Sequence, residues 1–519
     1  MKRTLVWVVL HGFAMLFVLI NLFTGFRIAT VSYPHWLFFS VWLPQGQLHS
    51  IHIYSGIALS ALTLSYCTYR WRLKPSVKSS PHRGINAFNK RFIKVSYVLF
   101  PTLIVTGWLL LGGYAGDASK LHFYLAHGAL LYLFLHAGGY FVQYGVTVFV
   151  SLFSTQVTGP EIRQILVVLT LTCVPWMGLF LTSSSTLTAT TLPPDQVISI
   201  DGIADEHIWK NTPSTYVETH GGEGFENGYT RIGIKALHNQ QDIFFHITWD
   251  DPTESLNHLP LVKTDKGWQV QEDGFYRFDE KRFYEDKLAI MLSNTCNLGA
   301  DGTAHLGPKP LEGKPANWHG KGYHYSPDNS LRDLWHWKAV RTNAMYQADD
   351  NSFTTPQQVD PAKRRYTAGY ITDGKESGAY VMNWQWYSPH GVTPKRLPNS
   401  NLTSSFSSIN QSTRYAPYLS WHDTMAYTQH VDQSPLKTIL PSVLHNSNQF
   451  EGDRGDVRAF GRWNNGVWSL EIARRLETGS VQDIAIRDGV CLWVAAFDHS
   501  QIAHTRHAQG IRLAFEAAQ

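Results

Sequence analysis

The sequence predicts a multidomain membrane protein, with an all-α bundle of about five transmembrane helices followed by an all-β, sandwich-like domain. The first observation is five apolar runs before residue 182, each about 20 residues long, which is the length an α-helix needs to cross a bilayer. The second is a Ser/Thr run ending in two prolines, at Thr182–Pro194, typical of an exposed linker. The third is a change of pattern beyond it to short β-rich runs. We therefore expect a transmembrane domain at 1–182, a linker at 183–196 and an outer domain at 197–519.

The five predicted spans follow one another closely. The first run lacks a small-residue cleavage site and is too long for a signal peptide, so we expect it to remain as the first helix. The predicted spans are Leu5–Phe26, His49–Tyr69, Val95–Tyr114, Leu121–Phe141 and Ile162–Leu181.

Basic residues predict the orientation of the spans. The connection from Arg70 to Lys94 holds eight Lys and Arg residues and no acidic residue, whereas Ala29–Gln47 holds no Lys or Arg. The positive-inside rule puts the first connection and the N-terminus in the cytoplasm. Five spans then place everything after Leu181 outside, so we expect a bacterial inner-membrane protein with a periplasmic C-terminal domain.

Charge and cysteine content exclude several classes of function. The net charge is +4, and no basic stretch interleaved with aromatic residues occurs, so nucleic acid is not an expected partner. The four cysteines form no zinc pattern and no Cys-x-x-Cys-His motif, so no covalent c-type haem is expected. A Cys296–Cys491 bridge is one pairing open to them. No phosphate loop or nucleophile–base constellation points to a hydrolase or transferase.

The fourth span carries the most informative residues. His122 and His136 lie fourteen positions apart, which places them on one helix face about 21 Å apart along the axis. Imidazole inside a membrane is costly, so such residues default to a functional interpretation. The pair indicates ligation of two stacked b haems, one near each membrane face. The alternative is that both histidines are interfacial or bond to helices.

The predicted topology pairs these histidines with others. His11 and His136 both fall on the cytoplasmic side, and His49 or His52 falls with His122 on the outer side. The orientation argument used no histidine, so this agreement in depth supports the haem interpretation.

Two choices between neighbouring histidines remain open. We favour His52 over His49 because it lies deeper in its span, and the other residue would then contact a haem propionate or quinone. His127 faces away from His136, which makes it the weaker alternative to His122.

The membrane third resembles a known family. The segments HGFAMLFVLINLFTGFRIA and LPQGQLHSIHIYSG, with the histidine-bearing fourth span, resemble bacterial di-haem cytochrome b subunits that anchor formate dehydrogenases and nickel–iron hydrogenases. The resemblance implies electron transfer between membrane quinone and a periplasmic redox partner. It also implies four haem ligands on helices one, two and four, which are here His11, His52, His122 and His136.

The polar remainder predicts a β-sandwich or a related all-β domain. Leu256–Lys281 and Asn343–Leu440 are expected to be rich in loops. The predicted strands are Val197–Ile200, Thr230–Ala236, Asp242–Trp249, Lys287–Leu292, Gly466–Ile472 and Val490–Phe497.

Five segments of this domain resemble a second family. IDGIADEHIW, DIFFHITWDDPT, EDKLAIML, LWHWKA and GVWSLEIARRL resemble the haem-binding domain of ethylbenzene dehydrogenase gamma subunits. The resemblance implies a β-sandwich holding one b haem through Met and Lys. This chain lacks a counterpart of the axial Met in the loop CNLGADGTAH, so the family's ligands do not transfer. Thioether, imidazole and amine groups that could bind haem iron are Met291, His305, His336, Lys338, His499 and His504.

Together these features predict a b-type cytochrome that transfers electrons between quinone or quinol and a periplasmic redox protein or oxidoreductase subunit. Two membrane haems and one outer haem would carry the electrons. One alternative is a periplasmic oxidoreductase acting on a small substrate at the outer haem. Another is a haem-free, ligand-binding outer domain on a cytochrome b anchor. An electron-transfer cytochrome is favoured over a stand-alone catalyst.

Overall fold

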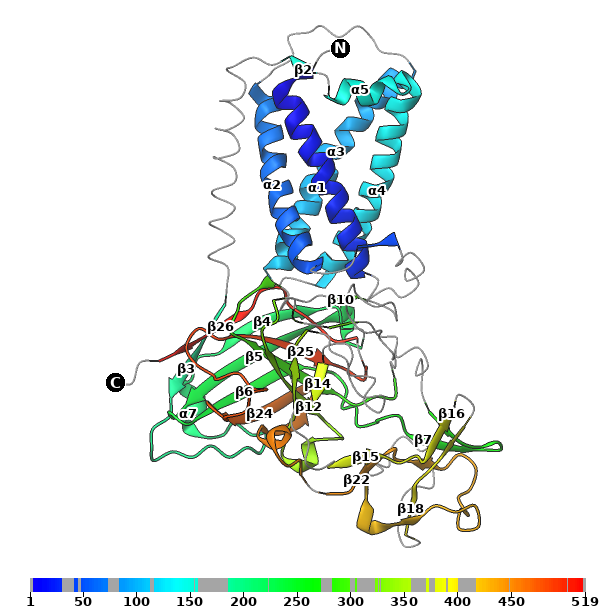
Figure 1. Cartoon of the computed structure of the whole chain (residues 1–519), viewed down its shortest axis with the longest axis vertical. Helices are drawn as coiled ribbons and strands as arrows, with labels where there is room; N and C mark the ends of the chain where they lie inside the picture. Colours follow the sequence, from blue (N-terminus) through cyan, green and yellow to red (C-terminus); the bar gives the residue numbers. More distant parts are fainter. Residues whose placement is uncertain are drawn as a thin grey trace. The chain divides into compact units, whose positions relative to one another are not determined.

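The chain divides into two compact units, Met1–Ser184 and Ser185–Gln519, and each is considered by itself (Figure 1). The computed structural model describes residues 3–29, 42–44, 48–72, 84–112, 116–153, 155–156, 185–222, 224–271, 282–298, 304–305, 323–324, 326, 328–355, 370–372, 379–388, 391–399, 417–447, 449–501 and 503–516.

The first unit is a helical bundle. Its main packing pairs are α1 with α2 and α3 with α4. A short parallel pair, β1 (Arg3–Thr4) and β2 (Thr155–Gln156), joins two segments of the same unit. The helices are α1 (Leu5–Ala29), α2 (Leu48–Arg72), α3 (Ile85–Leu111), α4 (Gly116–Tyr144) and α5 (Thr147–Phe153).

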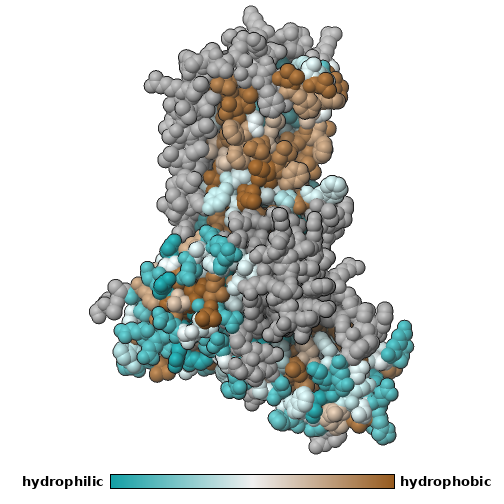
Figure 2. All heavy atoms as spheres, in the orientation of Figure 1, coloured by the Kyte–Doolittle hydropathy of each residue, from teal (hydrophilic) through white to brown (hydrophobic). Residues whose placement is uncertain are grey.

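Apolar side chains cover the outside of this bundle. Phe134 and Val142 are 69% and 76% exposed, and Figure 2 shows hydrophobic residues spread over the visible face of the helices. Such an apolar surface is suited to lipid and would be costly in water. The helical character predicted for this region is confirmed, and its surface is apolar, as a membrane-spanning bundle requires.

Within the described residues, three helices are long and apolar enough to cross a membrane: Leu5–Ala29, Ala87–Leu111 and Asp117–Tyr144. α2 has the same length as α1 but is more polar, since it carries serines, histidines and two terminal arginines. The predicted fifth span, Ile162–Leu181, lies outside the described residues.

The second unit is built on a twelve-stranded sheet. The strand order is β14-β13-β12-β9-β25-β26-β3-β5-β6-β24-β23, and β4 pairs with β5. The strands are β3 (Thr186–Thr191), β4 (Thr215–His220), β5 (Tyr229–His238), β6 (Asp242–Asp250), β9 (Lys287–Ser293), β12 (Arg332–Lys338), β13 (Asp349–Phe353), β14 (Tyr370–Thr372), β23 (Arg458–Asn464), β24 (Val467–Arg475), β25 (Cys491–Phe497) and β26 (Ile511–Phe515).

The two ends of this sheet pack face to face around one hydrophobic core. The ring of Trp249 on β6 lies 5.9 Å from that of Trp337 on β12, although these strands are far apart in the strand order. Trp468 on β24 stacks on Trp249 at 5.9 Å. Residues at alternate positions of β5 and β6 belong to this core and supply one inner face of the sandwich. The predicted β-rich sandwich is therefore correct.

A smaller set of strands surrounds a separate core that includes Leu261, Trp268 and Leu444. Many of these strands lie in the two segments predicted to be loop-rich, and they are only two to four residues long. They are β7 (Leu261–Thr264), β8 (Gly267–Val270), β15 (Tyr380–Met382), β16 (Trp386–Ser388), β17 (Gly391–Thr393), β18 (Arg396–Pro398), β19 (Leu419–Ser420), β20 (Thr424–Ala426), β21 (Ile439–Leu440) and β22 (Val443–His445).

The predicted linker is wrong over Thr186–Thr191, which forms β3 between β26 and β5. Leu187 and Ala189 are fully buried on one face of this strand, and β-branched threonines favour strands. The predicted strand Val197–Ile200 is also wrong. Ile198 in this segment packs against Trp209 in a side cluster instead of joining the sheet.

Candidate haem-binding sites

The helical unit brings four histidines together as two pairs. His11 on α1 and His136 on α4 have ring centroids 6.4 Å apart, with an interplanar angle of 60°. His52 on α2 and His122 on α4 have centroids 6.3 Å apart, at 86°. The membrane topology predicts these same two pairs.

The spacing within each pair fits a shared metal ion. An ion held by two imidazoles at about 2 Å from each nitrogen puts the ring centroids roughly 6 Å apart, once about 1.2 Å from nitrogen to ring centre is added on each side. Both observed separations agree with this value. Bis-imidazole ligation is chemistry that haem iron accepts, so the donor set fits haem b.

Two threonines orient the second pair. Thr24 Oγ1 lies 3.0 Å from His52 Nδ1, and Thr106 Oγ1 lies 2.8 Å from His122 Nδ1. Each hydroxyl also donates its hydrogen to a carbonyl one turn earlier, that of Ile20 for Thr24 and that of Thr102 for Thr106. The hydroxyl must then accept from Nδ1–H, which assigns the tautomer and leaves the Nε2 lone pair to bind a metal.

A glycine follows each of these threonines and makes room for the imidazole. A Cβ on Gly25 would lie 3.0 Å from His52 Cε1, and one on Gly107 would lie 3.4 Å from His122 Cε1. The repeated Thr-Gly dipeptide, on α1 and on α3, is thus a matched support for the two rings. The sequence contains this signal, a Thr-Gly in each of two apolar spans, but the histidine pattern alone does not indicate its role.

The first pair has aromatic rather than hydroxyl neighbours. Trp7 stacks on His11 with centroids 4.5 Å apart, and Tyr132 stacks on His136 at 5.3 Å. The Tyr132 hydroxyl lies 3.4 Å from His136 Nδ1. The two pairs therefore have different surroundings, which is one way in which a protein sets different haem potentials.

The alternative histidines have other settings. His127 Nδ1 lies 2.8 Å from the carbonyl oxygen of Phe123, and its ring packs edge-on against Phe26 and Phe123. His49 lies three residues before His52 on α2 and is partly buried. The structure thus brings His122, rather than His127, onto His52.

In the β-rich unit, two of the outer candidates share an apolar sheet face. His336 on β12 lies opposite Ala289 on β9, and Met291 lies two residues along β9 on the same face. Met291 joins a small cluster with Leu334 and Phe497. The His336 ring is 5.4 Å from that of Phe497.

His336 is the strongest of the outer candidates. Burial, followed by the nearby positive charges of Lys338 and Lys287, holds its pKa well below the usual range, so the imidazole is neutral. Its Nε2 is buried and has no hydrogen-bond partner among the described residues. A neutral imidazole with an unused nitrogen is the form that binds a metal.

The other candidates are less suited to ligation. Lys338 forms a buried ion pair with Asp349, and His499 pairs with Asp498. His504 Nδ1 lies 2.7 Å from the carbonyl oxygen of Thr505. His305 lies in the two-residue strand β10 (Ala304–His305), which pairs with β11 (Tyr323–His324), and its side chain lies outside the described part.

Residues 206–509 match the family model described as ethylbenzene dehydrogenase. The match covers more than half of the 519 residues. The chain belongs to the ethylbenzene dehydrogenase family. The haem-domain resemblance of the polar segments is thereby confirmed.

A second model accounts for the helical unit of this ethylbenzene dehydrogenase family member. Residues 2–147 match the model described as prokaryotic cytochrome b561. The helical unit is therefore a membrane b-type cytochrome, and haem b is its implied cofactor. This agrees with the donor chemistry of the four histidines.

Other comparisons add little. No curated protein matches the chain. A family 9 carbohydrate-binding module from Caldicellulosiruptor kristjanssonii in complex with glucose shares 9% identity at a TM-score of 0.23, covering 64% of this chain and 98% of its own. A putative carbohydrate-binding protein from Bacteroides uniformis shares 8% identity at a TM-score of 0.24, covering 64% of this chain and 100% of its own. Similarity this low supports no conclusion about this chain.

Proposed function

We propose that this protein is an electron-transfer cytochrome that carries electrons between membrane quinone and a periplasmic redox partner. Two b haems in the helical unit and one in the β-rich unit would form the path. The observation that carries the proposal is the two histidine pairs. Each pair joins one histidine of α4 to one on another helix, with the spacing of two imidazoles around one metal ion. Haem supplies one-electron chemistry when bound.

The residues of the chain would position the haems and adjust their surroundings. His11 with His136, and His52 with His122, would supply the axial nitrogens. Thr24 would hold the proton on His52 Nδ1, which strengthens Nε2 as a donor. The apolar bundle would exclude water and so favour the less charged state of each centre.

His336 would supply one axial nitrogen to the outer haem. The apolar face shared by Met291, Leu334 and Phe497 suits the porphyrin edge. This assignment departs from the Met and Lys ligands implied by the family resemblance. The ion pair between Lys338 and Asp349 gives a physical reason for that departure.

The periplasmic location is part of the proposal. It is supported by a disulfide between Cys296 and Cys491, because disulfides persist in oxidising compartments. Cys491 is fully buried at the start of β25, and Cys296 follows the neighbouring strand β9. The two cysteines are 195 positions apart in the sequence, so the bond closes a long loop.

Replacing Cys296 by serine is expected to lower the free energy of unfolding of the β-rich unit by about 2–4 kcal/mol, because the cross-link restricts the unfolded chain. Denaturant unfolding of the wild type and the variant measures this difference. Adding a reductant should lower the stability of the wild type to that of Cys296→Ser and leave the variant unchanged. Equal stability of the two proteins without reductant would exclude a structural bridge.

Haem stoichiometry tests the proposed function. The pyridine haemochrome assay on the purified full chain is expected to give three b haems per chain. A value of two haems, with the same haem content in His336→Ala, would show that the outer domain holds no haem. The protein would then be a membrane cytochrome with a different kind of outer domain. No haem at all would refute the proposal.

Replacing Thr106 by valine tests the support of His122. Valine keeps the shape but cannot accept from Nδ1–H, so the affinity for one haem should fall by about tenfold or more and its midpoint potential should rise. Redox titration followed by haem spectra measures both. Thr106→Ser should keep wild-type values. Thr102→Val should change neither quantity, because the Thr102 hydroxyl donates to the Val98 carbonyl one turn before it and contacts neither histidine ring in the described part of the chain.

A further inference from the structure

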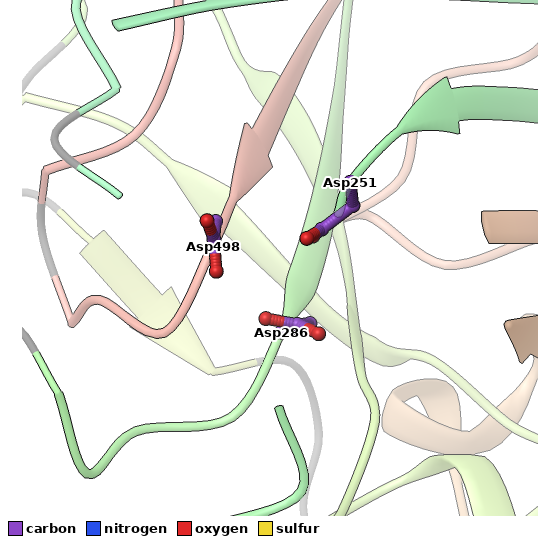
Figure 3. Close-up of side chains that lie close together, drawn as sticks. All are labelled: Asp251, Asp286 and Asp498. Carbon is purple, nitrogen blue, oxygen red and sulfur yellow. The ribbon is translucent and has the colours of Figure 1, made fainter. Parts of the chain in front are cut away.

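Three buried aspartates meet at one end of the β-sandwich (Figure 3). Asp251 directly follows β6, Asp286 directly precedes β9, and Asp498 directly follows β25. β9 and β25 pair so that Lys287 lies opposite Phe497, which makes Asp286 and Asp498 neighbours. Asp251 comes from the other layer, so the cluster joins the two faces of the sandwich.

All three side chains are shielded from water. Asp251 and Asp286 are 0% exposed and Asp498 is 1% exposed. One carboxylate oxygen from each lies within 4.8 Å of the others. Three carboxylates this close and this dry repel one another strongly unless something neutralises them.

Several carboxylate oxygens of the cluster have hydrogen-bond or ion-pair partners. Asp286 Oδ2 accepts from Ser255 N at 2.7 Å and from Trp468 Nε1 at 3.2 Å, and Asp286 Oδ1 accepts from His499 N at 3.1 Å. Asp498 pairs with the His499 imidazole.

One oxygen of the cluster has no such partner. Asp251 Oδ1 accepts from Thr253 N at 3.1 Å, whereas Asp251 Oδ2 is buried and receives no hydrogen bond from the described residues. Figure 3 shows the Asp251 carboxylate pointing toward Asp286 and Asp498. A buried carboxylate oxygen without a donor costs free energy comparable to several lost hydrogen bonds, so its direction indicates a ligand between the three groups.

The charge of the cluster is also unbalanced. His499 is the basic side chain in contact with it among the described residues, and the hydrogen bond to Asp498 raises the pKa of this imidazole. Burial, together with the Asp498 carboxylate, raises the pKa of Asp251 to about 7, and burial with the Asp251 carboxylate raises that of Asp286 well above its usual range. A second acidic cluster, Asp350 with Asp456 and Asp483, differs because the Arg474 guanidinium lies 3.8 Å from Asp483.

We propose that Asp251, Asp286 and Asp498 bind one hard divalent cation of the calcium type, which ties the two layers of the sandwich together at this end. The protein side chains offered are all carboxylate oxygens, which suit Ca²⁺ or Mg²⁺ rather than a soft transition metal. The larger, less regular coordination of Ca²⁺ suits ligands from three separate segments. Asp251 Oδ2 then gains the partner that the described residues do not provide.

Calcium titration of the full chain in detergent tests this proposal. The protein is first treated with a chelator and desalted. Calorimetric titration with CaCl₂ should show one saturable site per chain, and saturating Ca²⁺ should raise the unfolding midpoint of the β-rich unit by about 3 °C or more. Asp251→Asn should lose both effects. Asp265→Asn removes the same charge at an exposed position and should keep both.

Terbium provides a second measurement on the wild type, so the result does not depend on the folding of Asp251→Asn. Tb³⁺ at the site should be sensitised by Trp468, whose indole touches Asp286, and should be displaced by Ca²⁺. Absence of saturable binding of Ca²⁺, Mg²⁺ and Tb³⁺ would overturn the proposal, as would unchanged Ca²⁺ binding in Asp251→Asn. An Asp251→Asn variant that is more stable than a calcium-insensitive wild type would show that a shared proton neutralises the cluster instead.

Discussion

Replacing His136 by alanine is expected to lower the haem content of the purified chain by one haem, while the spectrum of the second membrane haem is retained. Among the described histidines, His136 pairs with His11, at 6.4 Å, and the pair of His52 with His122 lies fourteen residues away along α4. Without His136, one haem would be held by a single histidine, while His52 and His122 are unchanged. Pyridine haemochrome assay and reduced-minus-oxidised spectra measure the outcome.

Matched variants make the test specific. His52→Ala should remove the other haem and spare the first. His127→Ala should retain both, because the His127 ring packs against Phe26 and Phe123 instead of facing His52. Haem content in His136→Ala equal to that of the wild type would refute the assignment, and loss of haem in His127→Ala would move the second site by five residues.

The membrane pairs could be predicted because depth in a bilayer is nearly one-dimensional. Counting residues along each span and applying the positive-inside rule gives the level of every histidine. His11 and His136 are then matched before any side chain is placed. That count does not include the rotation of each helix about its axis. It therefore does not predict the contacts of Thr24 and Thr106, which lie on different helices from the histidines they support.

The sequence predicts the strands that carry the family motifs, but it does not predict which side chains these strands bring together. DIFFHITWDDPT ends near Asp251 and EDKLAIML begins near Asp286, so two motifs meet at the buried aspartate cluster. Nothing in a linear sequence indicates that β9 begins next to the point where β6 ends, because the two strands are far apart in the strand order. His336 is one of six candidates in the sequence. It differs from Lys338 in the structure because its Nε2 has no partner among the described residues, whereas the Lys338 amine is paired with Asp349.

The error in the predicted linker has a physical cause. Thr186–Thr191 was assigned to the linker from its Ser/Thr content, yet Leu187 and Ala189 alternate with threonines in the pattern of a half-buried strand. This strand pairs with β26, the last strand of the unit, and with β5. The residues around Thr186–Thr191 in the sequence give no sign of a partner as distant as β26. A separately expressed outer domain must therefore begin at or before Ser185.

Arg474 is expected to be one of the most sensitive positions for the stability of the β-rich unit. Its guanidinium and the Asp333 carboxylate are both fully buried and form an ion pair. Arg474 also contacts Asp483 at 3.8 Å and donates to the carbonyl of Ile484. Replacing it by leucine leaves Asp333 as an uncompensated buried charge, so we expect the free energy of unfolding to fall by about 3–5 kcal/mol.

The pH dependence of the defect distinguishes lost charge from lost packing. Burial already raises the pKa of Asp333, and loss of the guanidinium would raise it further above the unfolded value. At low pH the Asp333 carboxyl is then neutral and its burial costs little. As the pH rises through the pKa of the folded state, the carboxyl ionises and the free energy of unfolding falls. Denaturant unfolding at several pH values should therefore show a larger defect at high pH in Arg474→Leu.

The neighbouring arginine provides the control for this experiment. Arg475 lies on the same strand but is exposed, so Arg475→Leu should change the free energy of unfolding by less than about 0.5 kcal/mol. A pH-independent loss in Arg474→Leu would assign the effect to packing against Trp335, over which the guanidinium lies at 4.9 Å. A loss that grows with pH requires the buried ion pair, because leucine fills a similar volume without charge.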